Sequence, residues 1–131
     1  MCLDTNILIF LHDNSGSGKK GLAQNLLVEN PSISSQVISE YLNTTRRILN
    51  LSKEDLLIQT ANLFSGCNVI PVGASTLSLA GSLVIKYQFQ LFDAVVVAAA
   101  IEGGCDLLYS EDMHHGLIVN KCLTIFNPFK N

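Results

Sequence analysis

The stretch LFDAVVVAAA, from Leu91 to Ala100, is apolar at every position except Asp93. The stretch is rich in Val and Ala and is followed by Gly103 and Gly104. This pattern predicts a helix over 92–104 that is buried on all sides and ends at the glycines. The carboxylate at its start has two interpretations. It bonds backbone N–H groups and favours the helix dipole, or it meets carboxylates from other segments at a shared site.

The composition predicts a single α/β domain over residues 1–131. The chain is 48% hydrophobic and 15% charged, which favours a buried parallel sheet or an apolar face for a partner. No apolar run reaches the roughly 20 residues that span a bilayer, and MCLDTN lacks the features of a signal peptide. We therefore expect a cytoplasmic protein without membrane contact.

The charge and the cysteines argue against a general polyanion binder and against a disulfide-rich or zinc-binding protein. A net charge of −3 argues against a general polyanion binder, although it allows a local acidic site. The four cysteines are widely separated and form no CxxC pair. This favours reduced thiols over a disulfide framework or a zinc site.

Short apolar runs alternate with helical patterns along the chain, which indicates a mostly parallel central sheet. We expect a turn over 13–21 and a helix that begins after Ser52. The predicted strands span 2–5, 32–34, 68–72, 106–110 and 123–129, and the other predicted helices span 6–12, 22–30, 35–50, 75–88 and 92–104.

Acidic residues stand where such a sheet places its ligands, beyond the carboxyl ends of the strands. Asp4 ends the first predicted strand, Asp93 opens a helix, and Asp112 follows the strand over 106–110. Glu40 lies within its helix at the border of the apolar face. We expect Glu111, in contrast, to face outward.

Two other patterns leave alternatives open. Lys19-Lys20 and Arg46-Arg47 either contact phosphates or are solvated charges. The SGSGKKG segment lacks the glycine and hydroxyl spacing of a phosphate-binding loop, and the adjacent His114 and His115 have no third histidine at metal-ligand spacing. A phosphoryl-transfer domain built on Asp4 would need a basic residue near the acids.

The four acids occur in motifs that together resemble PIN-domain nucleases, most closely the VapC-type toxins of toxin–antitoxin pairs. These motifs are LDTNIL, SQVISEYLN, LFDAVVVAAA and LYSEDM, and the closing NPF is also similar. The resemblance implies a three-layer α/β/α fold. It also implies endonucleolytic cleavage of RNA that leaves 5′-phosphate and 3′-hydroxyl ends, a VapB-like antitoxin and a homodimer.

The chemistry of the acids points to a divalent ion. Crowded carboxylates repel one another, and oxygen ligands without Cys or His suit Mg²⁺ or Mn²⁺. Such an ion supports phosphodiester hydrolysis by a metal-held hydroxide. We expect the catalytic and metal-binding residues to be Asp4, Glu40, Asp93 and Asp112, with Thr5, Asn6 and Ser110 orienting the carboxylates.

Two alternatives remain. The chain could be a PIN-domain nuclease of RNA processing rather than a toxin, or a catalytically silent PIN-like module that binds RNA or protein. The presence of all four acids argues against the silent module.

Overall fold

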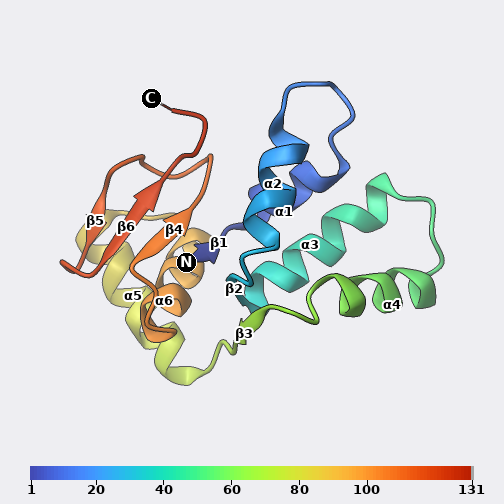
Figure 1. Cartoon of the computed structure of the whole chain (residues 1–131). Helices are drawn as coiled ribbons and strands as arrows, with labels where there is room; N and C mark the ends of the chain where they lie inside the picture. Colours follow the sequence, from blue (N-terminus) through green and yellow to red (C-terminus); the bar gives the residue numbers. More distant parts are fainter. Residues whose placement is uncertain (131) are drawn as a thin grey trace.

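The computed structural model describes residues 1–130. Six strands in this part of the chain form one sheet with the order β3-β2-β1-β4-β6-β5 (Figure 1). Their bounds are β1 Cys2–Leu3, β2 Ser32–Ser34, β3 Asn68–Ile70, β4 Leu107–Tyr109, β5 Ile118–Val119 and β6 Leu123–Phe126.

Helices α3 and α4 each begin after a serine whose side chain caps the helix. The Ser34 hydroxyl accepts a bond from the N–H of Val37, and the Ser52 hydroxyl accepts one from Asp55, both at 3.1 Å. The bounds are α1 Thr5–Ile9, the 3₁₀ turn η1 Phe10–His12, α2 Lys19–Leu27, α3 Ser35–Ile48, α4 Lys53–Leu63, α5 Ala74–Tyr87 and α6 Leu91–Glu102.

The chain reverses its direction of travel across the sheet between β1 and β4. From β1 it proceeds outward through β2 to β3, and it returns to add β4, β6 and β5 on the other side. The pairs up to β6 are parallel, so their carboxyl ends lie at one edge. A crevice between two such halves is the usual ligand site of an open parallel sheet.

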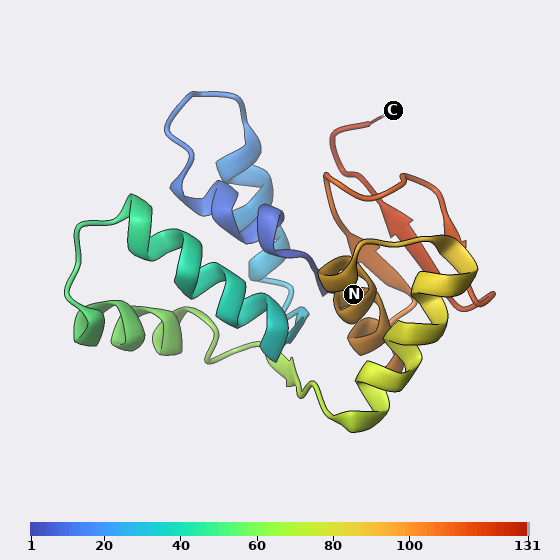
Figure 2. The same cartoon turned by 180° about the vertical axis from the view of Figure 1, so that it is seen from behind.

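Helices lie on both sides of the sheet, which confirms the three-layer α/β/α prediction. Helices α5 and α6 stand in front of the strands in Figure 2, whereas α2 lies toward the viewer in Figure 1. Helices α3 and α4 pack against each other beyond the β2–β3 side of the sheet (Figure 1).

Helix α6 forms the centre of the core, as its composition predicts. Its residues from Ala94 to Ala100 are all buried. Their small side chains allow the helix axis to approach the neighbouring elements closely. Within residues 1–130 no single helix is long and apolar enough to cross a membrane; α5 and α6 together have that length and composition, but the pair is bent by 118°.

The sequence missed one strand and misplaced the start of one helix. Strand β5 pairs antiparallel with β6 through a turn in which Asn120 and Lys121 both have positive φ. Two residues are too few for a periodicity signal, and the turn lacks the glycine that usually marks such hairpins. Helix α2 begins at Lys19, within the segment expected to be a turn, because Gly18 adopts a left-handed conformation before it.

The packing of α6 predicts that it tolerates no added volume. Ala98→Leu should destabilise the fold by about 1–3 kcal/mol, since Ala98 is fully buried and the core offers no space. Urea unfolding measures this change. The matched control is Ala61→Leu on α4, an exposed site where less than about 0.5 kcal/mol is expected. Equal losses in both variants would contradict the close packing of α6.

Candidate active site

Asp4 and Ser110 follow the two central strands and meet at the carboxyl edge of the sheet. Leu3 lies beside Tyr109 in the β1–β4 register, so the next residue of each strand is also adjacent. The Asp4 N–H donates to the Tyr109 carbonyl at 2.9 Å, and the Ser110 hydroxyl donates to Asp4 Oδ2 at 2.8 Å. Both residues are buried. The position of the Asp4 carboxylate is therefore fixed by strand pairing.

Glu40 is directed toward the start of α1. The Thr5 hydroxyl donates to Glu40 Oε2 at 2.5 Å, and the Gln36 side chain donates to Oε1 at 3.0 Å. Glu40 is half-buried, as expected for the border of an apolar helix face. The structure thus brings a helical acid from α3 next to the residue that follows Asp4.

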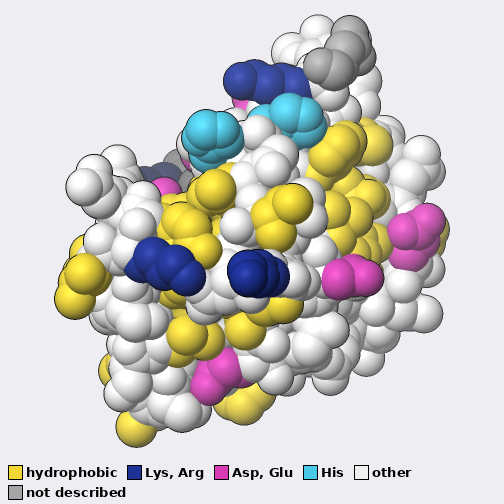
Figure 3. Space-filling model, turned by 90° about the vertical axis from the view of Figure 1, so that its left-hand side faces the viewer, with side chains coloured by type: hydrophobic (Ala, Val, Ile, Leu, Met, Phe, Trp, Pro, Cys, Tyr) yellow, Lys and Arg dark blue, Asp and Glu magenta, His cyan; other side chains and the backbone are white. Residues whose placement is uncertain are grey.

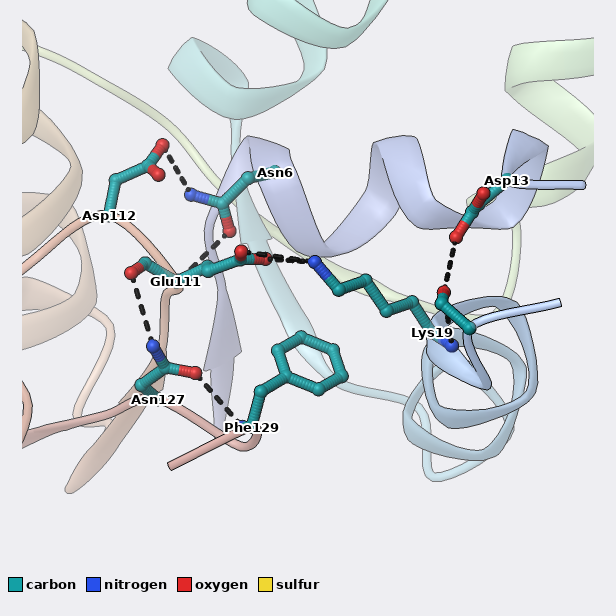
Figure 4. Close-up of polar contacts among 8 residues, drawn as sticks. Asn6, Asp13, Lys19, Glu111, Asp112, Asn127 and Phe129 are labelled. Carbon is teal, nitrogen blue, oxygen red and sulfur yellow. Dashed lines mark hydrogen bonds and ion pairs between the residues drawn. The ribbon is translucent and has the colours of Figure 1, made fainter. Parts of the chain in front are cut away.

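Asn6 connects the two strand ends (Figure 4). Its Nδ2 donates to Asp112 Oδ2 at 3.0 Å and lies 3.4 Å from Asp4 Oδ2. Its Oδ1 accepts a bond from the N–H of Glu111 at 3.2 Å. A single amide side chain therefore contacts the carboxylates of Asp4 and Asp112 and the backbone between Ser110 and Asp112.

Asp93 occupies the first turn of α6 and is half-buried. Within residues 1–130 no hydrogen-bond donor reaches its carboxylate, and Gln90, the residue at the N-cap, makes no side-chain cap bond. The interpretation of Asp93 as a simple helix cap predicts such a bond. Its absence from the described residues favours the shared site.

The pKa values show that the carboxylates act on one another. Burial raises the pKa of Asp4 from its usual 3.8 to about 6. Asp93 and Glu40 raise it further, against the lowering effect of bonds from Ser110 and Thr5. Burial also raises the pKa of Asp93, followed by the charges of Asp112 and Glu40. Asp4 and Asp93 therefore both lie within the field of other acids of the predicted site.

This environment suits a divalent cation in its chemistry. The carboxylates are oxygen donors of the type that Mg²⁺ and Mn²⁺ prefer. Asp4 is buried, and no basic side chain among residues 1–130 offsets its charge. In the arrangement of residues 1–130, no three His, Cys, Asp or Glu side chains are close enough together to hold an ion. The carboxylate oxygens are suitable ligands for the metal. To bind one ion, the carboxylates would have to move closer to one another.

Glu111, which the sequence predicts to face outward, has a side chain that is about one-third exposed. Its carboxylate pairs with Lys19, whose Nζ lies 3.1 Å from Oε1 and 3.3 Å from Oε2 (Figure 4). The buried Asn127 donates to the Glu111 carbonyl at 3.2 Å. The sequence left Lys19 open between a phosphate contact and a solvated charge, and it gave Asn127 no place at the site. The NPF motif was the only signal for Asn127.

The fold and these motifs identify the class. The PIN domain family matches residues 1–116, and the chain belongs to this family. A search of the curated proteins found no match.

Solved structures of toxin–antitoxin proteins share the fold. A toxin–antitoxin complex from Klebsiella pneumoniae is 21% identical, with a TM-score of 0.72, and the alignment covers 99% of this chain and 98% of that one. VapBC2 from Rickettsia felis, bound to promoter DNA, is 19% identical over 96% and 98%, with a TM-score of 0.67. VapC20 from Mycobacterium tuberculosis, a Sarcin-Ricin loop cleaving toxin, is 18% identical over 82% and 85%, with a TM-score of 0.64.

The raised pKa of Asp4 predicts a pH-dependent stability. The folded protein retains the Asp4 proton up to about pH 6, whereas the unfolded chain releases it near 3.8. The free energy of unfolding of the metal-free protein should therefore fall as the pH rises through this window, by up to about 3 kcal/mol from this residue. Asp4→Asn should remove that loss, measured by urea unfolding between pH 4 and 7.

The control is Asp106→Asn, the same substitution at an exposed position at the other end of β4. Its pH profile should run parallel to that of the parent. If Asp4→Asn also runs parallel to the parent, the buried carboxylate carries no excess repulsion and the account of the site fails.

Proposed function

We propose that this protein is a Mg²⁺- or Mn²⁺-dependent endoribonuclease and the toxin of a type II toxin–antitoxin pair. The observation that carries the proposal is the gathering of acids at the carboxyl ends of β1 and β4 in a PIN domain. Burial, followed by the charges of Asp93 and Glu40, raises the pKa of Asp4, and burial, followed by the charges of Asp112 and Glu40, raises that of Asp93. Buried acids that repel one another without a cationic partner are costly to the fold. A cluster of acids with raised pKa values is therefore a candidate functional site.

In this proposal Asp4, Asp93 and Asp112 hold the ion. Glu40 completes its surroundings or orients the attacking water. The bound ion lowers the pKa of a water molecule and stabilises charge on a phosphoryl oxygen. The protein's own contribution is to fix the carboxylates, and the observed bonds from Thr5, Asn6 and Ser110 do this.

The RNA substrate is supported by membership of the PIN domain family and by the fold shared with VapC20, a Sarcin-Ricin loop cleaving toxin. Cleavage within the strand suits the site because the acids lie at the edge of the sheet, where Asp112 is exposed. The expected products carry 5′-phosphate and 3′-hydroxyl ends.

The proposed partners are a VapB-like antitoxin and a second copy of the chain. The solved structures with the same fold include several toxin–antitoxin complexes. Large apolar side chains are exposed on α5, α6, β5 and β6, and Figure 3 shows apolar patches on the face at this end of the molecule. These residues are Leu77, Ile85, Leu91, Phe92, Ile118 and Phe126. Surfaces of this kind usually mark interfaces.

A basic side chain of the antitoxin that reaches the four acids would inhibit by competing with the metal. The proposed location is the cytoplasm, where the free cysteines Cys2, Cys67, Cys105 and Cys122 stay reduced.

The proposal predicts that the purified protein cleaves single-stranded or loop RNA only when Mg²⁺ or Mn²⁺ is present. EDTA should abolish cleavage, and Asp93→Asn should lower the rate by at least about a hundredfold, because it removes a ligand and not merely a residue that orients one. Gel analysis of labelled RNA measures both effects. Asp106→Asn is the matched control, with a rate close to the parent's.

A measurement independent of activity accompanies this test. Saturating Mn²⁺ should raise the melting temperature of the parent. Binding to the folded state adds about 2.7 kcal/mol to the free energy of unfolding when the Mn²⁺ concentration is a hundred times the Mn²⁺ dissociation constant. Asp93→Asn should gain much less. Cleavage that survives EDTA, or equal stabilisation of parent and variant, would contradict the metal site.

A further inference from the structure

Lys19 places a positive charge next to the acidic site, although it comes from the first residue of α2. Its ammonium group is bonded to both carboxylate oxygens of Glu111, and Glu111 is the residue between Ser110 and Asp112 (Figure 4). Both side chains are about one-third exposed, at 31% and 32%. The cation is therefore held beside the segment that carries Ser110 and Asp112, and it is partly open to solvent.

Two aromatic rings fix the position of this charge. The Lys19 Nζ lies 4.7 Å from the centre of the Phe10 ring and 5.1 Å from that of Phe129. The rings themselves meet edge to face, with centres 5.3 Å apart. Aromatic faces attract an ammonium group but accept few of its hydrogen bonds. Among residues 1–130, Glu111 is the only side chain that accepts a bond from the Lys19 ammonium group, so one of the three ammonium donors is left for another acceptor.

The chemistry of the site shows what that acceptor would be. Four carboxylates repel a polyanionic strand, and an ion held by them offsets the repulsion only at the phosphate being cleaved. A neighbouring phosphate needs its own cation. A lysine is a common phosphate ligand, and an exposed ion pair such as Lys19–Glu111 exchanges its partner at little cost.

We propose that Lys19 binds a phosphate of the substrate strand adjacent to the cleaved bond, and that Glu111 holds Lys19 in place while the site is free of substrate. This inference rests on the proposed ribonuclease function. Phe10 and Phe129 position the ammonium group in both states. Glu111 therefore competes with the substrate for Lys19. An ion pair that only stabilised the fold would not compete with RNA.

The test measures binding of a fluorescent single-stranded RNA by anisotropy, at several salt concentrations and constant Mg²⁺. All variants carry Asp93→Asn so that the RNA is not cleaved. Lys19→Met should raise the dissociation constant about three- to tenfold and reduce the salt slope by about 0.7, the value for one lost phosphate contact. Lys20→Met, at the exposed neighbouring position, is the matched control and should leave the slope close to that of the Asp93→Asn reference.

Glu111→Gln provides the second, opposite arm. It frees Lys19 and should lower the dissociation constant while leaving the salt slope unchanged. If the Lys19–Glu111 pair only stabilised the fold, Lys19→Met and Glu111→Gln would weaken RNA binding to the same extent. That result, or an unchanged slope in Lys19→Met, overturns the inference while metal-dependent cleavage by the parent still supports the nuclease. No RNA binding and no cleavage by the parent would overturn both.

Discussion

The buried carboxylate of Asp4 is the constraint on which the site depends. Strand pairing between β1 and β4 places it beneath Ser110, and burial together with Asp93 and Glu40 raises its pKa to about 6. A carboxylate in this position opposes folding when it is charged and unpartnered. The presence of a buried acid here is explained if a cation binds there, because the cation offsets the repulsion among the acids and takes them as ligands.

The rest of the molecule brings the other acids to this point. Helix α6 is built from small residues, so that it packs closely in the core and presents Asp93 in its first turn. Helix α3 carries Glu40 to Thr5, while Asn6 joins Asp4 to Asp112. The four acids come from four separate segments, two after strands and two in helices. The parallel sheet brings the two strand-end acids to the same edge. Stability and chemistry therefore depend on the same packing.

Much of this architecture could be predicted from the sequence, because strong periodicity and strand-end acids obey simple rules. The run after Asp93 predicted a buried helix, and the alternation of elements predicted the parallel sheet. Strand β5 could not be found, since two residues give no pattern. The ion pair of Lys19 with Glu111 could not be predicted for a different reason. Their pairing joins positions 92 residues apart, and no local signal records such a contact.

The central claim is that the four acids form one site for a divalent ion. Crystals of the parent grown with Mn²⁺ and measured at a wavelength where manganese scatters anomalously test it most directly. The account predicts an anomalous peak within ligating distance of the carboxylates of Asp4 and Asp93, with Asp112 or Glu40 directed toward it. Manganese bound only elsewhere, or an unoccupied crevice in crystals of protein that still cleaves RNA with Mn²⁺, would contradict it.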